Sequence, residues 1–352
     1  MKILGLVGAT CLVGQTFLDI IAMSENFFFD EIKLYASKSS VGKVLSVGKK
    51  KCPIEEITLS SLLQCHAVVF ACESSIAREY IPKLAEKGIF CVDKSSAFRD
   101  HPTAPLMVPE INASLFHEPS FQTFPVVASP NCCAIPLSMV LKALDQAFGV
   151  TRAVVSTYQS VSGAGKAAVD VLTEETKNFF QVQDIRCEKS TVFPKSIAFN
   201  VMPFVSSILE NGHSEEEEKI VLETKKILQK KDLLLSVTSV RVPTFVSHAQ
   251  ALSVELDKYF DMEEVLLVLS KFPGLKVVDE KEKTKPMEDE DNPIENFVTP
   301  REAHGQDEVF ISRIRKCEVF KNGLSLWVVC DNLRKGAALN AWQILQSYYL
   351  AL

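Results

Sequence analysis

The first 128 residues alternate between short apolar runs and longer stretches with helical periodicity. Apolar runs at 31–36, 67–71 and 89–92 predict buried strands, and the stretch 76–87 predicts a helix between two of them. Such alternation is typical of a parallel, doubly wound sheet with helices on both faces. We therefore predict an α/β domain at the amino-terminal end.

Beyond residue 128 the pattern changes to longer strands in which polar and apolar residues alternate. The segments 150–158, 235–242 and 249–256 show it, and helical stretches lie between them. This pattern predicts a second, α+β domain built on a mixed sheet. The tail 336–350 is helical again, and we expect it to pack on the first domain. The predicted division is 1–128 plus 330–352 for one domain and 129–329 for the other.

A glycine turn follows the first predicted strand. Residues 2–14 read as a short strand, a tight turn and the start of an apolar helix, which indicates a dinucleotide-binding fold. In such folds glycines let the main chain approach the pyrophosphate of the cofactor. A secretory signal is the alternative, but Gln15, Thr16 and Asp19 interrupt the apolar run. The candidate cofactor-binding residues of this turn are Gly8, Thr10, Cys11, Leu12, Val13 and Gly14.

Composition narrows the class of protein. The net charge of −6 argues against a nucleic-acid surface, and no apolar run approaches the ~20 residues of a membrane span. The ten cysteines are scattered without the paired spacings of a metal site, so we expect no metal and mostly reduced thiols. Such a chain suits the cytoplasm. The charged stretch 279–291 lacks apolar periodicity and predicts a solvated loop.

One cysteine is placed to react. Cys132 follows a strand-like run at 124–128 and precedes an apolar helical stretch. Asn131 has the character of an N-cap, and a helix start there would favour the thiolate. A small buried thiol is the alternative interpretation, and it is the one we favour for Cys133.

A glycine turn and two polar side chains stand out in the second domain. A second glycine turn, 158–165, ends one strand and opens a helix. Arg241 ends a later strand and His248 begins the next, and Pro243 between them predicts a turn that brings both to one pocket. An arginine suits a carboxylate and a histidine suits proton transfer, although each alone is also an ordinary surface or core residue.

Read together, these segments resemble aspartate-semialdehyde dehydrogenase of the bacterial type. The resemblance runs through nearly the whole chain. Besides the amino-terminal turn, it rests on residues 92–99, 108–110 and 130–132, on Gln159 with Ser162 and Gly163, and on residues 197–201, 241–248, 307–310 and 331–338. It implies a Rossmann-type domain for the cofactor and a catalytic domain that also dimerises.

The family's reaction is the reductive dephosphorylation of L-aspartyl 4-phosphate by NADPH, in the biosynthesis of lysine and diaminopimelate, threonine and methionine. The resemblance implies a thioester on Cys132, with His248 as acid/base and Gln159 orienting the acyl group. It implies that Arg241 grips the substrate carboxylate and Glu216 its ammonium group, although the run 215–218 also predicts a solvated helix face. The remaining implied roles are phosphate binding by Arg99 and Lys219, cofactor contacts by Ser162, Gly163 and Asn332, and assembly as a homodimer or homotetramer.

The chain departs from the family pattern around the cofactor. Cys11 stands where a glycine is usual, Ser39 where arginine is frequent, and Glu73 where relatives are glycine-rich. Lys38, together with Ser37 and Ser39, supplies a cation and hydroxyl donors after the second predicted strand, and that segment has no acidic residue for the ribose hydroxyls of NAD. We therefore predict a preference for NADP.

Three other functions remain open. N-acetyl-γ-glutamyl-phosphate reductase shares the fold and the acyl-phosphate chemistry, but its nucleophile segment usually has glycine where Asn131 stands. A phosphorylating glyceraldehyde-3-phosphate dehydrogenase shares the thiol chemistry, but Arg241 suits a carboxylate better than a sugar phosphate. A catalytically idle NADP-binding protein is the third alternative. The presence of four candidate catalytic residues in one chain counts against it: Cys132, Gln159, Arg241 and His248.

Overall fold

The computed structural model describes residues 1–25, 27–182, 192–278 and 297–351, and the chain divides into two compact units. The first unit is Met1–Cys132 with Gly336–Leu352, and the second is Cys133–Lys335. The sequence places these boundaries a few residues earlier, at 128 and 329. The predicted solvated loop 279–291 lies outside the described residues.

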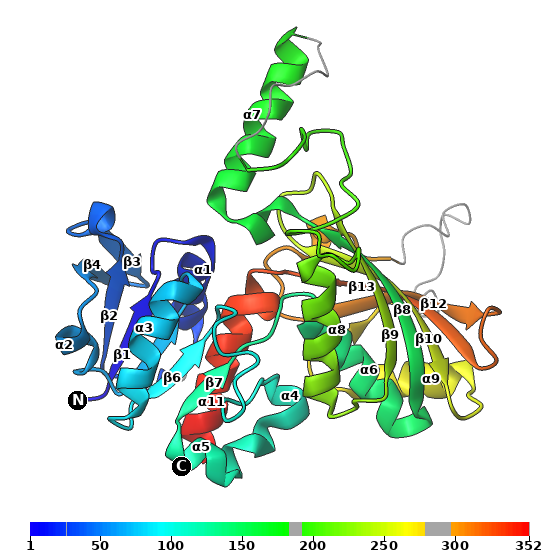
Figure 1. The fold of residues 1–352 in the computed structure, drawn as a ribbon, viewed down its shortest axis with the longest axis horizontal. Coiled ribbons are helices and arrows are strands. Elements are labelled where there is room, and N and C mark those ends of the chain that lie inside the picture. The colour runs from blue at the N-terminus through cyan, green and yellow to red at the C-terminus, as the bar shows by residue number, and fades with distance from the viewer. Residues whose placement is uncertain (26, 183–191, 279–296, 352) are drawn as a thin grey trace, which may run out of the picture. The chain divides into compact units, whose positions relative to one another are not determined.

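A mostly parallel sheet forms the core of the first unit (Figure 1). Among the described residues it has seven strands in the order β3-β4-β2-β1-β5-β6-β7, and every neighbouring pair is parallel except the hairpin β3–β4. The predicted doubly wound sheet is confirmed, and the hairpin adds an edge that the sequence pattern did not predict. The strands are β1 (Ile3–Val7), β2 (Glu31–Ala36), β3 (Val44–Val47), β4 (Lys50–Glu56), β5 (Ala67–Phe70), β6 (Phe90–Asp93) and β7 (Val126–Ala128).

The carboxyl-terminal helix belongs to the core of this first unit. Phe90 packs against Tyr348 with ring centroids 4.2 Å apart, and Phe17 meets Trp342 edge-on at 6.1 Å. The predicted return of the tail to the first domain is therefore observed. The helices of this unit are α1 (Leu12–Met23), η1 (Lys38–Ser40), α2 (Leu59–Leu62), α3 (Ser74–Ala85), α4 (Pro109–Asn112), η2 (Ala113–His117), α5 (Pro119–Thr123) and α11 (Leu339–Ala351), and the short π-helix η4 (Arg334–Ala338) leads into the last.

The second unit is built on a mixed sheet, as predicted. In the described part of the chain its six strands follow the order β11-β12-β13-β10-β8-β9. The pairs β8–β9 and β11–β12 are parallel, and the other three pairs are antiparallel. The strands are β8 (Val150–Gln159), β9 (Leu234–Arg241), β10 (His248–Leu256), β11 (Leu275–Val277), β12 (Val309–Cys317) and β13 (Gly323–Cys330).

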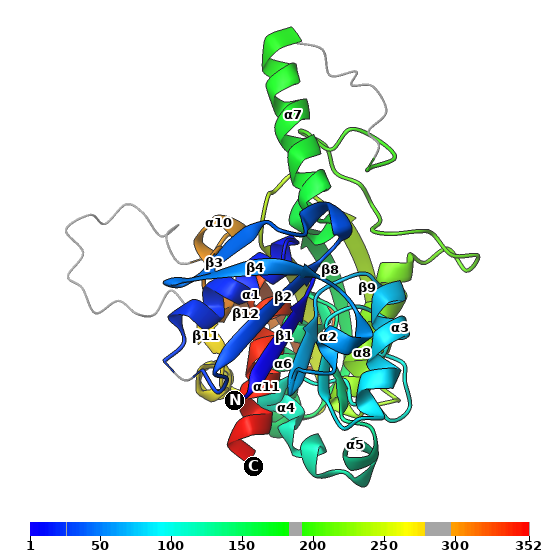
Figure 2. The same ribbon diagram turned by 90° about the vertical axis from the view of Figure 1, so that its left-hand side faces the viewer.

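Helix α6 (Ala134–Phe148) is apolar on nearly every side and packs on strands β8, β10 and β13 of this sheet. Helix α7 (Lys166–Val182) projects away from the sheet in both views (Figures 1 and 2). The remaining helices of the unit are η3 (Val161–Ala164), α8 (Glu215–Leu228), α9 (Met262–Lys271) and α10 (Pro300–Ala303). None of the helices within the described ranges has the length and apolar character that crossing a membrane requires.

Candidate active site

Cys132 lies in the turn between β7 and α6. The turn is tied to the neighbouring strand, because the N–H of Ser129 donates to the carbonyl of Asp93 at 2.8 Å and Nζ of Lys94 donates to the carbonyl of Pro130 at 3.1 Å. The Cys132 side chain is half-buried, whereas Cys133 is fully buried. Exposure therefore distinguishes the two adjacent thiols and supports Cys132 as the one that a substrate can reach.

The prediction that Asn131 caps the helix is wrong. Helix α6 begins at Ala134 with Cys133 at its N-cap, and the N–H of Leu137 donates to the carbonyl of Cys133 at 3.3 Å. Pro136 occupies the third helical position and has no N–H, so one of the two groups that a capping side chain accepts from is missing. Because Cys132 precedes the helix by two residues, the helix dipole acts on it less directly than the sequence suggested.

Gln250 holds this turn, and sequence reasoning missed it. Its Nε2 donates to the carbonyl of Cys133 at 2.8 Å, and the side chain is buried. Gln250 and His248 are two residues apart on β10 and so point to the same face of the sheet. A ring nitrogen of His248 lies within 4.8 Å of the Cys133 sulfur. A glutamine on the same strand face as Leu252 and Val254 was the available signal.

The structure brings Arg241 and His248 together beside Gly163. A Cβ atom on Gly163 would lie 3.2 Å from the guanidinium Nη1 of Arg241 and 3.2 Å from Nε2 of His248. Arg241 also donates from Nη1 to the carbonyl of Ser160 at 2.7 Å, and both side chains are buried. The turn after β9 thus places a cation and an imidazole side by side against Gly163, where a larger residue would crowd both.

Gln159 and Glu216 form a buried pair at the end of β8. Nε2 of Gln159 donates to Oε1 of Glu216 at 3.0 Å, and Glu216 is 8% exposed. The capping box of Ser214 and Glu217 starts α8, and of the four consecutive glutamates Glu216 and Glu217 are buried. The alternative interpretation of Glu216 as part of a solvated face is therefore wrong.

The two predicted phosphate-binding cations differ in their surroundings. Lys219 is partly exposed and pairs with Glu215 at 2.9 Å, and this ammonium group holds the pKa of the Glu215 carboxyl below its usual range. Arg99, in the first unit, is buried and donates to the carbonyls of Ser95 and Lys94 at 3.1 and 3.2 Å. Burial raises the pKa of the neighbouring Asp93 carboxyl, while N–H bonds from Ser95 and Phe98 and the Arg99 charge oppose that rise.

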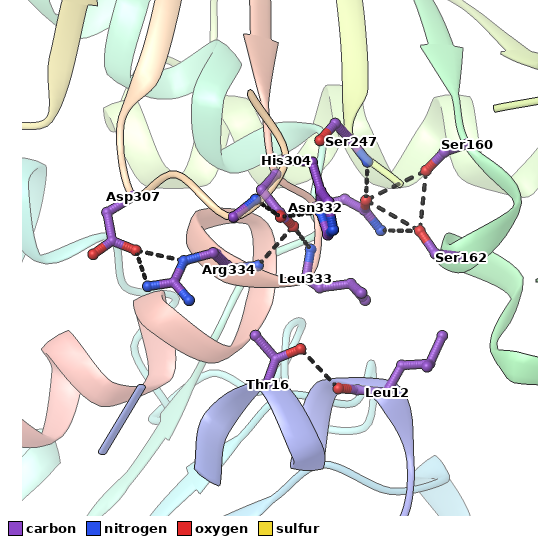
Figure 3. Close-up of polar contacts among 12 residues, drawn as sticks. Leu12, Thr16, Ser160, Ser162, Ser247, His304, Asp307, Asn332, Leu333 and Arg334 are labelled. Atoms are coloured by element: carbon purple, nitrogen blue, oxygen red, sulfur yellow. Dashed lines mark hydrogen bonds and ion pairs between the residues drawn. The ribbon is translucent and has the colours of Figure 1, made fainter. Parts of the chain in front are cut away.

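Asn332 lies at the centre of a polar cluster in the second unit (Figure 3). Its Oδ1 accepts from the N–H of Ser247 at 2.8 Å, and its Nδ2 donates to the hydroxyl of Ser162 at 3.0 Å. The Ser160 hydroxyl is within reach of the same Oδ1 at 3.3 Å. Residues from three distant parts of the sequence therefore meet at one buried amide.

The first unit carries the predicted glycine turn. Gly8 has φ +90°, and a Cβ atom there would lie 2.1 Å from the carbonyl oxygen of Ala71. Cys11 has an extended conformation with φ −77°, so a glycine is not required at that position. Its sulfur accepts from the N–H of Gly14 at 3.2 Å and its thiol donates to the carbonyl of Ala71 at 3.1 Å. Burial raises the pKa of this thiol, which keeps it neutral as the cap of α1.

The other residues of the turn leave the helix start open. Thr10, Leu12 and Val13 are half-buried, and the first N–H groups of a helix have no partner inside it. This donor set fits a pyrophosphate at the start of α1. Glu73, whose position near this turn raised doubt, is exposed and begins α3 without a capping bond.

An acidic residue lies near the end of β2, and sequence reasoning missed it. Glu56 at the end of β4 is in register with Ala36, the last residue of β2, and pairs with Lys38 at 3.4 Å. Both charged groups are largely exposed. The hydroxyls of Ser37 and Ser39 are 3.0 Å apart. The surface predicted to prefer a phosphate thus offers a cation that is already paired.

Comparisons with known proteins agree with this architecture. Residues 3–118 match the family model of the semialdehyde dehydrogenase NAD binding domain, and residues 141–335 match that of the semialdehyde dehydrogenase dimerisation domain. The aspartate-semialdehyde dehydrogenase of Aquifex aeolicus is 40% identical over 343 residues, which cover 97% of this chain and 96% of the relative. The chain belongs to the aspartate-semialdehyde dehydrogenase family.

Solved structures of this family have the same fold. Aspartate semialdehyde dehydrogenase II of Vibrio cholerae, complexed with ASA, has a TM-score of 0.88 and 32% identity, with coverage of 99% of this chain and 98% of that one. The enzyme from Candida albicans, solved with NADP, has a TM-score of 0.71 at 20% identity, with coverage of 99% of each chain. The chain is thus an oxidoreductase of a family of amino-acid biosynthesis, with a nicotinamide-cofactor domain and a domain for oligomerisation.

Proposed function

We propose that the chain reduces L-aspartyl 4-phosphate to L-aspartate 4-semialdehyde and phosphate with NADPH, through a thioester on Cys132. One observation carries the proposal: Arg241 and His248 converge on Gly163, where a substrate with a carboxylate and a reacting carbonyl would meet both. Family membership supports the reaction class. The convergence of Arg241 and His248 supports a substrate that carries a carboxylate and a reacting carbonyl. The product would supply the synthesis of lysine and diaminopimelate, threonine and methionine.

The proposed reaction has two covalent steps. The Cys132 thiolate attacks the acyl carbon, the carbon–oxygen bond to phosphate breaks, and a thioester remains. A nicotinamide cofactor, when bound, would provide the hydride that the thioester carbon receives. The carbon–sulfur bond then breaks, the aldehyde leaves and the thiolate is restored, and the one proton consumed overall ends on phosphate. His248 acts on the carbonyl oxygen, which gains negative charge in both steps.

The remaining buried polar groups would orient the substrate. Arg241 is proposed to hold the α-carboxylate with its planar fork, and Glu216 to accept from the ammonium group. Gln159, bound to Glu216 at 3.0 Å, would then connect the amino-acid end of the substrate to its acyl end. Arg99 and Lys219 are proposed to bind the departing phosphate.

NADP is the proposed cofactor. Gly8, Thr10, Cys11, Leu12, Val13 and Gly14 would hold its pyrophosphate at the start of α1, and Ser37, Lys38 and Ser39 its 2′-phosphate. Ser162, Gly163 and Asn332 would complete the binding set. The family relative from Candida albicans that was solved with NADP supports a nicotinamide cofactor of this type. We further propose a homodimer or homotetramer, in keeping with the dimerisation domain.

Phosphate-dependent reduction of NADP with aspartate semialdehyde tests the proposal. We expect turnover with aspartate semialdehyde and at most trace turnover with N-acetylglutamate semialdehyde. The reverse preference would identify N-acetyl-γ-glutamyl-phosphate reductase. Absence of turnover with both, in a folded protein that binds NADP, would favour an idle binding protein.

A further inference from the structure

The two ring nitrogens of the buried His248 imidazole have different surroundings. Nδ1 lies 3.0 Å from the main-chain nitrogen of Ser160 and 3.1 Å from its hydroxyl. Nε2 is buried and has no hydrogen-bond partner within the described ranges. That nitrogen lies beside Gly163, 3.2 Å from the position that a Cβ atom would take there. The unpartnered nitrogen therefore faces the region where the substrate is proposed to bind.

The main-chain N–H of Ser160 decides where the imidazole carries its proton. A neutral imidazole has one N–H and one lone pair, and a main-chain N–H can only donate. Because this N–H points at Nδ1, Nδ1 must be the acceptor and Nε2 must carry the proton. The opposite tautomer would set two N–H groups against each other at 3.0 Å.

The hydroxyls of Ser160 and Ser162 are placed so that they can reinforce the same tautomer. Asn332 is oriented by the N–H of Ser247, which donates to Oδ1 at 2.8 Å, so Nδ2 faces Ser162 and donates to its hydroxyl at 3.0 Å. The Ser162 hydroxyl is 3.1 Å from that of Ser160, which is 3.1 Å from Nδ1 of His248. In one arrangement of the hydroxyl protons, donors run in one direction from Asn332 through Ser162 and Ser160 (Figure 3) and on to the imidazole.

Two other arrangements of the hydroxyl protons are geometrically open. Both serine hydroxyls are also within reach of Oδ1 of Asn332, at 3.3 Å for Ser160 and 3.2 Å for Ser162. That oxygen already accepts the shorter bond from Ser247. Neither arrangement alters the Ser160 N–H, so the tautomer of His248 is the same in each.

We propose that Ser160 is a positioning residue that holds His248 with its proton on Nε2, so that the imidazole acts as a hydrogen-bond donor in both covalent steps. The inference rests on the proposed function and makes it more specific. An Nε2–H has no lone pair with which to accept a proton, but it stabilises an oxyanion each time one forms and needs no net proton transfer. The carbonyl of Ser160 also accepts from Arg241, so one residue fixes both side chains.

Nitrogen NMR of the full-length protein labelled with ¹⁵N-histidine tests the tautomer directly. The chain has six histidines, and a His248→Asn variant identifies the signal of His248 by its loss. We expect the proton on Nε2 and an unprotonated, hydrogen-bonded Nδ1. A proton on Nδ1 would overturn the proposal. The measurement does not depend on turnover, so its result is separate from the outcome of the substrate assay.

A matched pair of serine variants tests the positioning role. Ser160→Ala removes one of the two donors to Nδ1 and keeps the main-chain N–H. We expect the tautomer to persist, the Nδ1 signal to shift toward that of a free ring, and kcat to fall about 3- to 10-fold with KM nearly unchanged. The control is Ser239→Ala, since Ser239 is also fully buried but its hydroxyl has no partner among the described residues.

The control should leave both the kinetics and the His248 signal unchanged. A Ser160→Ala protein with wild-type kcat and an unchanged Nδ1 signal would show that the hydroxyl does not act on the imidazole. An equal loss of kcat in both variants would attribute the effect to general packing of the unit, and would count against the proposal.

Discussion

Gly8 in the first unit and Gly163 in the second are surrounded by different kinds of atoms. A Cβ atom on Gly8 would meet the main-chain oxygen of Ala71 at 2.1 Å, and the residue has φ +90°. A Cβ atom on Gly163 would meet two side chains, those of Arg241 and His248, each at 3.2 Å. The first glycine is required by the course of the main chain, and the second by the close approach of two functional side chains.

The two turns also differ in how they use side chains. Around Gly8 the contacts that shape the turn are made largely by the main chain, with the Cys11 sulfur as cap of α1. Around Gly163 the shape depends on side chains that come from β8, β9, β10 and the segment after β13. The turn at Gly8 is determined by a few consecutive residues. The site at Gly163 is formed by residues that are distant in the sequence.

The largest effect is expected at the nucleophile. Cys132→Ala removes the sulfur that would form the thioester and should lower kcat by several orders of magnitude. Cys133→Ala is the matched variant and should retain most activity, because the Cys133 thiol is fully buried whereas Cys132 is only half-buried. Mass spectrometry after brief exposure to acyl phosphate should locate the adduct on Cys132. An adduct on Cys133 would reverse the assignment.

Arg241→Lys tests the side-chain part of the comparison. Lysine keeps the charge but loses the planar fork, so we expect a loss of about 2–4 kcal/mol in transition-state binding. The measurement is kcat/KM for aspartate semialdehyde, together with NADPH affinity, which should be preserved. Weaker NADPH binding with normal kcat/KM for the amino-acid substrate would place Arg241 in the cofactor site.

Alanine at the two glycines should separate stability from activity. Gly8→Ala forces a left-handed conformation and a main-chain clash, and should destabilise the first unit by roughly 1–3 kcal/mol. Gly163→Ala meets only side chains that can shift by a few tenths of an ångström, so the melting temperature should change little while kcat falls. The measurements are the melting temperature from thermal unfolding and kcat from steady-state kinetics, for both variants. Loss of stability in Gly163→Ala with normal kcat would contradict the distinction.

The smallest effect concerns the choice of cofactor. Lys38 is paired with Glu56, so its charge is partly neutralised. Lys38→Ala should reduce the preference for NADP by a few-fold, whereas Ser39→Arg and Glu56→Gln should each increase it. The readout is kcat/KM with NADP and with NAD for each variant. Better use of NAD by the unaltered protein would refute the predicted preference.

The sequence predicts the two-unit architecture well because each element carries its own periodicity. The pattern locates β2 and the core of β8, β9 and β10 to within a residue or two at either end. It missed the hairpin β3–β4, where exposed lysines hide the alternation. The consequence is local but relevant, since that hairpin brings Glu56 beside the end of β2.

The candidate site is less accessible to sequence reasoning. Cys132, Arg241 and His248 stand out by residue type and by their position at the ends of elements. The supporting residues do not, because a serine or glutamine has no distinctive chemistry until its partners are known. Ser160 is significant only because its N–H and carbonyl meet His248 and Arg241, which are 81 or more positions away in the sequence. Glu216 was ambiguous because it stands in a run of four glutamates, and the sequence does not show which of them is buried.

Gln250 has a mechanical consequence. Its amide fastens the first carbonyl of α6 to the strand that also carries His248. This hydrogen bond opposes any sliding of α6 along β10 that would separate the Cys133 carbonyl from the strand that carries the imidazole. The spacing between the start of α6 and the strand position of His248 is therefore held by a side chain of that same strand.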